Sequence, residues 1–243
     1  MKTTAIIQAR LGSTRLPGKV IMDVYGETML ARVVRRTLKA KMLDEVVVAT
    51  TDLRQDDPIV AEAHRLGVMV FRGSETNVLD RYYQAAQTYH ADVIVRITSD
   101  CPLIDPEIVD LVIWRFLKDK ADYASNVLRR TYPRGLDTEV MTNEALTSAW
   151  RQATETFQQE HVTPYLYQNP HQFRLLSVTA EKDYTQHRWC VDTIEDLDFV
   201  RQVYSLLGHN GYFGWQKVLS IVDKKPELLQ INRQIRQKEV TEA

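Results

Sequence analysis

The sequence predicts an α/β fold in which helices cover both faces of a mostly parallel sheet, and two patterns carry this prediction. The first is a series of short apolar runs, most of them rich in Val or Ile, at residues 5–9, 45–50, 67–71, 92–97 and, more weakly, 122–126. Such runs are typical of strands buried on both faces. The second is a set of apolar stripes at helical spacing within residues 29–38, 79–86 and 108–116. Each stripe falls on one helical face.

Strands that alternate with helices indicate βαβ units joined by right-handed crossovers. We therefore predict a Rossmann-like three-layer α/β/α sandwich. The pattern loosens after residue 127, where strand-like runs mix with helical ones at 137–141, 143–153, 157–168 and 172–180. We interpret residues 127–187 as a small excursion from the sheet.

The last third of the chain predicts a strand end, a helix and a helical tail. A strand end at 188–191 precedes a helix for which Thr193 is the expected N-cap, with Glu195 and Asp196 as acids in its first turn. Residues 213–243 are predicted to be helical. Because no repeat, low-complexity tract or Gly/Ser linker interrupts the sequence, residues 1–243 are expected to form a single domain.

The balance of charge excludes a general attraction to polyanions. Lys plus Arg total 31 and Asp plus Glu total 32. We therefore expect no nucleic-acid partner and no membrane partner, and any anion must bind through a local arrangement of charge. The first apolar run is too short for a signal peptide, and no segment reaches the roughly 18 uncharged residues of a membrane span. These features predict a cytoplasmic protein. Cys101 and Cys190 fit neither a disulfide framework nor a zinc motif.

The loop after the first strand, ARLGSTRLPGK, concentrates cations on an otherwise neutral chain. It holds Arg10, Arg15 and Lys19 together with Gly12 and Ser13. Ligands of doubly wound folds bind beyond the carboxyl ends of the strands, where backbone N–H groups, hydroxyls and cations can surround a polyphosphate. The loop is not a Walker A motif, because its Gly-Lys step comes one residue too late and no hydroxyl follows the lysine. The alternative is a solvated basic turn.

Two aspartates stand near the ends of later strands. Asp100 lies just after the run 92–97, and Asp192 follows the apolar stretch RWCV. A cation-lined phosphate site beside a carboxylate suggests Mg²⁺, which bridges phosphate oxygens and takes one or two protein carboxylates. If both aspartates meet, they form a metal pair. Otherwise the acids of VDTIEDLD only serve a helix N-terminus, as Asp105 before its Pro is expected to do.

These motifs resemble those of the CMP-sugar synthetases, the cytidylyltransferases for 3-deoxy-manno-octulosonate and for acylneuraminate. The first loop is similar to their A-R-x-x-S-x-R-x-P-x-K segment, and the matching residues are Ala9, Arg10, Ser13, Arg15, Pro17 and Lys19. SDCPLI resembles their G-D-x-P-L segment with Ser99 in place of glycine, and VDTIEDLD resembles D-T-x-E-D-L. Within this superfamily the SpsF group is the most similar, through segments that cover most of residues 3–207.

The resemblance implies that CMP is transferred from CTP to the oxygen of a sugar or sugar acid, with release of pyrophosphate, for a surface polysaccharide or glycan. It implies Mg²⁺ held by Asp100 and Asp192, and catalysis by Arg15, Lys19 and Asp100 through stabilisation of charge on the phosphates. The expected nucleotide-binding residues are Ala9, Arg10, Gly12, Ser13, Arg15, Lys19 and Arg81. For Arg81 the alternative is a surface ion pair with Asp80.

The segment RGLDTE is the candidate acceptor contact. Arg134 offers a clamp for a carboxylate or phosphate, and Asp137 or Glu139 would meet sugar hydroxyls. Because acylneuraminate enzymes dimerise through an excursion from the sheet, the resemblance also makes 141–187 a candidate homodimer element. Two alternatives stay open. One is a nucleotidyltransferase for a sugar phosphate, polyol phosphate or phosphonate, and the other is a nucleotide-binding module without catalysis.

Overall fold

The computed structural model describes residues 1–208 and 212–237. Within them, seven strands form one sheet in the order β3-β2-β1-β4-β6-β5-β7. Their bounds are β1 Thr3–Gln8, β2 Glu45–Thr51, β3 Met69–Gly73, β4 Val93–Thr98, β5 Tyr123–Ser125, β6 Glu139–Thr142 and β7 Leu175–Ser177. Strands β1 to β4 are parallel, β6 is antiparallel to both of its neighbours, and β5 is parallel to β7. The predicted mostly parallel sheet is confirmed.

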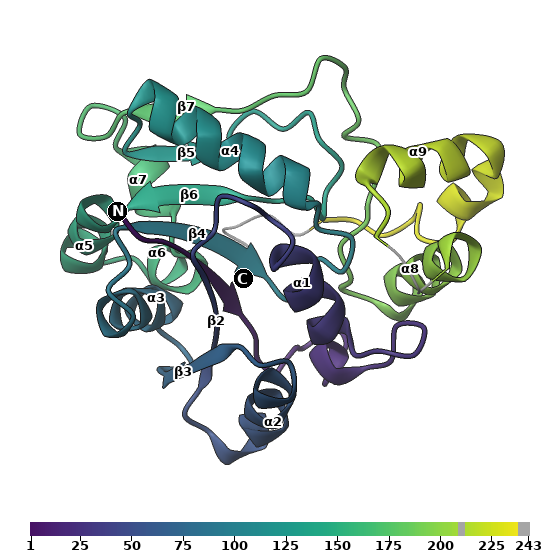
Figure 1. The fold of residues 1–243 in the computed structure, drawn as a ribbon, viewed down its shortest axis with the longest axis horizontal. Helices are drawn as coiled ribbons and strands as arrows, with labels where there is room; N and C mark the ends of the chain where they lie inside the picture. The colour runs from purple at the N-terminus through teal and green to yellow at the C-terminus, as the bar shows by residue number, and fades with distance from the viewer. Residues whose placement is uncertain (209–211, 238–243) are drawn as a thin grey trace.

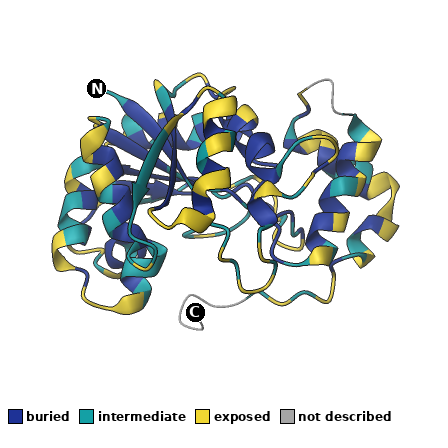
Figure 2. Ribbon diagram, turned by 90° about the horizontal axis from the view of Figure 1, so that it is seen from below, coloured by how far each residue is buried: buried dark blue, intermediate teal, exposed yellow. Residues whose placement is uncertain are grey.

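Helices cover both faces of this sheet, as Figure 1 shows. One face carries α1 Met29–Thr37, α2 Asp57–Arg65 and α4 Pro106–Asp119. The core on this face continues beside the sheet to α8 Ile194–Leu207 and α9 Trp215–Lys224. The other face carries α3 Val78–Thr88, α5 Asn143–Gln152, α6 Thr156–His161 and α7 Pro164–Gln168. Strand alternation explains the two cores, because Ala5 and Ile7 of β1 pack on the first face and Ile6 on the second. Figure 2 shows buried strands between helices with exposed outer surfaces.

Two helical features differ from the sequence prediction. No helix was expected at α2, where the apolar signal is weak because only Ile59 and Ala63 are buried. The predicted helix 157–168 is divided into α6 and α7. Val162 has a φ of 74° between them, and Pro164 begins α7 without an N–H group to continue the helix before it.

The segment 188–191, predicted as a strand end, is not a regular strand. It crosses the carboxyl end of β4 and is fixed there by single backbone hydrogen bonds. Trp189 N donates to Arg134 O at 2.7 Å, and Val191 N donates to Asp100 O at 2.8 Å. The helix after it begins as predicted, with Thr193 as N-cap of α8 and Asp196 completing a capping box.

The chain leaves the sheet after β5 and returns as β6, so the predicted excursion begins with the loop 126–138. The rest of that segment stays close to the sheet, because β6 and β7 belong to it and α5, α6 and α7 lie on its face. A homodimer through 141–187 stays a prediction.

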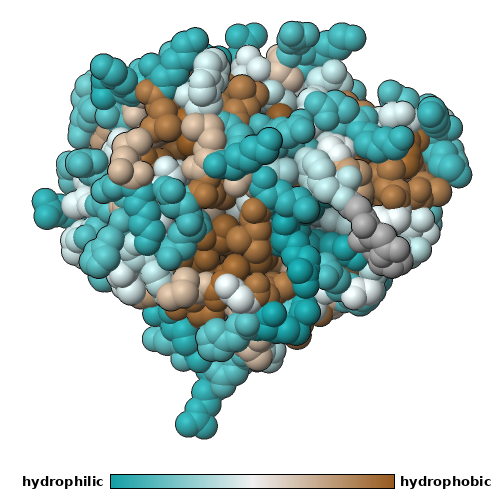
Figure 3. Space-filling model, viewed as in Figure 1, coloured by the Kyte–Doolittle hydropathy of each residue, from teal (hydrophilic) through white to brown (hydrophobic). Residues whose placement is uncertain are grey.

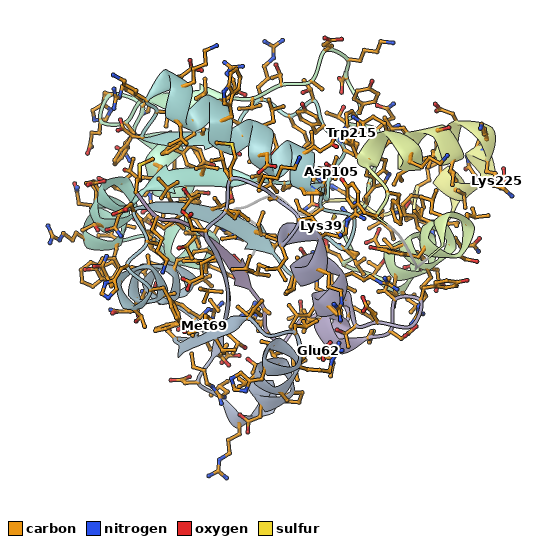
Figure 4. The ribbon with its side chains drawn as sticks, in the orientation of Figure 1. Lys39, Glu62, Met69, Asp105, Trp215 and Lys225 are labelled. Carbon is orange, nitrogen blue, oxygen red and sulfur yellow. The ribbon has the colours of Figure 1, made fainter. Side chains whose placement is uncertain are left out.

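Of the predicted helical tail, α9 and the 3-10 helix η3, Pro226–Gln230, are helical, whereas residues 231–237 are not, and 238–243 lie outside the described residues. Trp215, Val218 and Leu228 of this segment are buried in the first core. Asp105 caps α4 as predicted, and its other oxygen accepts from Trp215 N at 2.7 Å, which ties α9 to α4 (Figure 4).

The surface seen in Figure 3 is mixed, with polar side chains around a hydrophobic area near its centre. Among the helices of the described chain, none combines the length and the apolar character that a membrane crossing requires.

Candidate active site

The loop between β1 and the 3-10 helix η1, Lys19–Ile21, is anchored by a buried carboxylate. Leu11 N donates to Asp56 Oδ1 at 2.8 Å, and the Thr51 hydroxyl donates to the second oxygen of Asp56, which is fully buried. Gly18 has a φ of 72° at the N-cap of η1, a left-handed conformation that glycine adopts without strain. This geometry delivers Lys19 to a fixed place, unlike a freely solvated basic turn.

Lys19 is the centre of the site. Its side chain is almost buried, and Nζ donates to Asp100 Oδ2 at 2.9 Å, to Asp192 Oδ1 at 3.0 Å and to Val191 O at 2.7 Å. Burial lowers the pKa of Lys19, but attraction to the two aspartates outweighs burial and raises the pKa above its ordinary value. The ammonium group is therefore charged and holds two carboxylates together.

Asp100 follows the carboxyl end of β4 and is ionised. The Thr98 hydroxyl donates to Asp100 Oδ1 at 2.6 Å, while Oδ2 accepts from Lys19. Burial acts to raise the pKa of Asp100, but Lys19 and the Thr98 hydrogen bond lower it to about 2. The cysteine beside it, Cys101, has a pKa raised by burial and by this carboxylate, which makes it a poor nucleophile.

Asp192 accepts from three cations. Oδ1 lies 2.9 Å from Arg15 and 3.0 Å from Lys19, and Oδ2 lies 2.7 Å from Arg188. The structure thus brings together Arg15, Lys19, Asp100 and Asp192 from the loop after β1, the end of β4 and the segment before α8. The first loop and the two aspartates therefore meet beyond the carboxyl ends of β1 and β4.

The other predicted nucleotide-binding residues of the first loop make contacts away from this cluster. Ala9 is buried and its N–H donates to Ala49 O at 3.1 Å, while Gly12 is exposed. Ser13 shapes the loop, since its N–H donates to Leu11 O and its hydroxyl accepts from Leu16 N at 3.4 Å. Arg10 lies apart from the aspartates, with a guanidinium nitrogen 3.8 Å from Glu160 of α6.

Arg81 is buried, which excludes the surface ion pair considered as its alternative. Asp80 instead accepts from the Trp150 indole at 2.9 Å. One Arg81 nitrogen donates to Ser74 O at 2.6 Å, but within residues 1–208 and 212–237 its Nε has no partner. Burial, with a contribution from nearby Arg10, lowers the pKa of Arg81. A buried N–H donor without a partner lowers the stability of a folded protein, so such donors are uncommon.

The predicted acceptor residues fall into three different environments. Arg134 is half-buried, and its guanidinium makes no hydrogen bond or ion pair with the part of the chain that is described. Burial and the nearby Arg130 lower the pKa of Arg134. Asp137 is paired with Arg130 through two hydrogen bonds of 2.6 and 2.7 Å.

Glu139 is deeply buried in β6. It pairs with Arg96 of β4, the residue opposite it in the antiparallel ladder, and accepts from the hydroxyls of Tyr123 and Thr163. These contacts occupy its carboxylate, so a role for Glu139 in acceptor binding stays a prediction that would require this network to open.

Three residues of the site were not singled out from the sequence. They are Asp56, Arg130 and Arg188. Asp56 anchors the loop after β1, Arg130 pairs with Asp137, and Arg188 contacts both Asp192 and Asp196. Arg188 had a detectable signal, because it stands four residues before Asp192 in a segment already identified.

The donor set suits a hard divalent cation if a ligand supplies further oxygens. Within the described chain, no group of three or more His, Cys, Asp or Glu side chains could hold a metal ion. Asp100 and Asp192, which both contact the Lys19 ammonium, nevertheless supply two carboxylates. Mg²⁺ takes one or two protein carboxylates when substrate phosphates and water complete its shell.

A family sequence profile described as cytidylyltransferase matches residues 4–228. The spore coat polysaccharide biosynthesis protein SpsF of Bacillus subtilis is 34% identical over 229 residues, which are 91% of this chain and 94% of that protein. Both matches extend over most of the chain, and the family match includes the loop after β1, Asp100 and Asp192.

Two solved structures are also similar to this chain in fold. A cytidylyltransferase from Leptospira borgpetersenii superposes with a TM-score of 0.92 at 36% identity, over 98% of this chain and 100% of that one. CMP:2-keto-3-deoxy-manno-octonic acid synthetase, solved with CTP, superposes with a TM-score of 0.66 at 22% identity, over 86% and 100% of the two chains. The latter likeness is one of fold.

Proposed function

Given that the chain belongs to the cytidylyltransferase family, we propose that it transfers CMP from CTP to the oxygen of a sugar or sugar acid in the synthesis of a surface polysaccharide or glycan. The acceptor hydroxyl oxygen attacks the α-phosphorus and loses its proton to solvent, the bond from this phosphorus to the bridging oxygen breaks, and pyrophosphate leaves. Such a transfer depends on positioning and charge stabilisation more than on a covalent enzyme intermediate.

The observation that supports the proposal most directly is that two cations of the first loop contact one oxygen of Asp192. Arg15 and Lys19, which come from the first loop, both contact Asp192 Oδ1. A triphosphate is a stronger partner for these cations than one carboxylate. On CTP binding, Arg15 and Lys19 are expected to turn to the phosphates and to stabilise the charge that develops on pyrophosphate. Arg10 would join them from the edge of the loop, and the backbone at Ala9, Gly12 and Ser13 would line the same side.

A divalent cation completes this account. Once Lys19 turns to the phosphates, the carboxylates of Asp100 and Asp192 are free to hold Mg²⁺, the proposed cofactor. When bound, the ion would neutralise phosphate charge and polarise the reacting phosphoryl group. While Lys19 changes partner, the Thr98 hydroxyl would keep Asp100 oriented through its 2.6 Å hydrogen bond.

Arg81 is the proposed contact to the nucleotide away from the phosphates. Its unpaired Nε fits recognition of an acceptor atom such as a base carbonyl or ring nitrogen, and because this atom is buried, the residues that cover it would have to move when CTP binds. Binding would then satisfy a donor that the fold alone leaves unused.

Arg134 is the proposed contact to the acceptor. An unpaired, half-buried cation near Arg130 favours an anionic group, and a guanidinium holds carboxylate and phosphate equally well. This supports a sugar acid as acceptor, and it equally keeps a sugar phosphate, polyol phosphate or phosphonate as the second candidate.

Pyrophosphate release in the presence of CTP, Mg²⁺ and a panel of acceptors tests the proposal. The panel should pair 2-keto sugar acids with neutral sugars and with sugar and polyol phosphates. Release with a sugar or sugar acid supports the proposal, and release with phosphorylated acceptors alone favours the second candidate. Tight CTP binding without turnover on any acceptor would instead indicate a nucleotide-binding module.

A further inference from the structure

We propose that Arg188 is a positioning residue that fixes the Asp192 carboxylate by one oxygen, and that the C-terminal segment 226–237 holds Arg188 in this task. The inference rests on the proposed function, because it assigns the other oxygen of Asp192 to the cations of the reaction.

The guanidinium of Arg188 forms a bridge between two carboxylates. One nitrogen donates to Asp192 Oδ2 at 2.7 Å and to Asp196 Oδ2 at 3.1 Å, and Nε donates to Asp196 Oδ1 at 2.9 Å. Asp196 is fully buried in the first turn of α8, and its Oδ2 also accepts from the backbone N–H of Asp192 and Thr193. Arg188 therefore cannot turn away without leaving a buried carboxylate short of its charged partner.

The two oxygens of Asp192 consequently face different kinds of cation. Oδ1 contacts Arg15 and Lys19, which belong to the loop that is proposed to receive the triphosphate. Oδ2 contacts Arg188, which is tied to α8. When Arg15 and Lys19 change partner, Arg188 stays and keeps Oδ1 directed at the reaction centre. Contacts of this kind behind a ligating carboxylate orient it and increase its affinity for a metal.

The tail completes the surroundings of Arg188. Asn232, which is nearly buried, donates from Nδ2 to Asp196 Oδ1 at 2.9 Å and to Arg188 O at 3.0 Å. Gln237 accepts from the remaining guanidinium nitrogen of Arg188 at 2.6 Å. Leu228 of η3 is buried in the core beside α8 and fixes this segment. A residue 44 positions from Arg188 thus supports the site from the C-terminal segment.

The test measures metal affinity separately from turnover. Mn²⁺ binding in the presence of CTP would be followed by electron paramagnetic resonance for the wild type, Asn232→Ala, Arg188→Lys and the control Gln230→Ala, an exposed neighbour on η3. We expect Asn232→Ala and Arg188→Lys to bind Mn²⁺ about 10- to 100-fold more weakly. The concentration of Mg²⁺ that gives half-maximal rate should rise in parallel, while Gln230→Ala stays at the wild-type value.

Asn232→Ala keeps the Arg188 ion pairs, so it should fold even where Arg188→Lys does not, and circular dichroism would verify this. Weaker Mn²⁺ binding by folded Asn232→Ala supports the positioning role even if the wild type transfers no CMP to any acceptor. If the wild type transfers CMP and both folded variants bind Mn²⁺ as tightly as it does, the positioning role is overturned and the proposed function stands.

Discussion

Lys19 Nζ lies 2.9 Å from Asp100 Oδ2, although 81 positions separate the two residues in the chain. The contact joins the loop after β1 to the end of β4, and the same ammonium reaches Asp192 at 3.0 Å. A lysine so placed suits two partners in succession, the aspartates before CTP binds and the phosphates afterwards.

Replacing Lys19 by Ala should lower kcat at least about 100-fold, because a few kcal/mol of charge stabilisation on the phosphates is lost. Initial rates of pyrophosphate release measure this loss. Lys39→Ala is the matched control, since Lys39 is an exposed lysine just beyond α1 (Figure 4). Near-normal turnover of Lys19→Ala would remove Lys19 from the catalytic set.

Asp100→Asn should cost at least about 100-fold in turnover, because the amide keeps the shape of the side chain but not the charge that a divalent ion requires. The rate should be measured over a range of Mg²⁺ and Mn²⁺ concentrations. Asp198→Asn, on the exposed side of α8, serves for comparison. A variant that reaches the wild-type rate at high metal concentration would show that Asp100 contributes affinity for the metal without acting in the chemical step.

Arg81→Lys is expected to raise KM for CTP at least about tenfold with a smaller change in kcat, because lysine cannot reproduce the planar set of N–H donors. Arg115→Lys on the surface of α4 controls for the substitution itself. If KM for CTP is unchanged in a folded Arg81→Lys protein, the buried guanidinium has only a structural role.

Glu139→Gln distinguishes a structural from an acceptor-binding role. Loss of the carboxylate leaves the largely buried Arg96 without its charged partner, so the free energy of unfolding should fall by about 3 kcal/mol or more. Urea unfolding measures this change against Glu181→Gln, an exposed control. Unchanged stability together with a raised KM for the acceptor would support the original expectation that Glu139 meets the sugar.

His187 should make stability depend on pH. Burial lowers the pKa of this side chain, which nearby Asp223 only partly offsets. The unfolded chain then binds more protons than the folded one from about pH 6.5 downward, the ordinary pKa of His, so stability falls as the pH falls through this window. His187→Gln should reduce the difference between urea midpoints at pH 7.5 and pH 5.5. The exposed His171→Gln should not, and an equal pH dependence in all three proteins would contradict the assignment.

The sequence was informative where a pattern is local. Val- and Ile-rich runs identified β1, β2 and β4, which are buried on both faces, and also the partly exposed edge strand β3. The ends of β1 and β4 correctly predicted that the first loop and Asp100 would lie at the same edge of the sheet. The helix α2 was missed because it buries only Ile59 and Ala63.

Supporting contacts were harder to predict because they join distant parts of the chain. Asp56 reaches Leu11 across 45 positions, and Asn232 reaches Asp196 across 36. Neither residue belongs to a motif, and an Asp or Asn at these positions has many ordinary uses. Only the packed structure reveals which backbone or carboxylate it serves.

Transfer of label from CTP carrying ³²P at the α-phosphate tests the central claim most directly. With Mg²⁺ and an acceptor from the sugar or sugar-acid class, we predict that the label moves into a CMP-sugar in equal amount to the unlabelled pyrophosphate released, and that Lys19→Ala slows both at least about 100-fold. Label that stays in CTP, or that appears only as free CMP, with every such acceptor would contradict it.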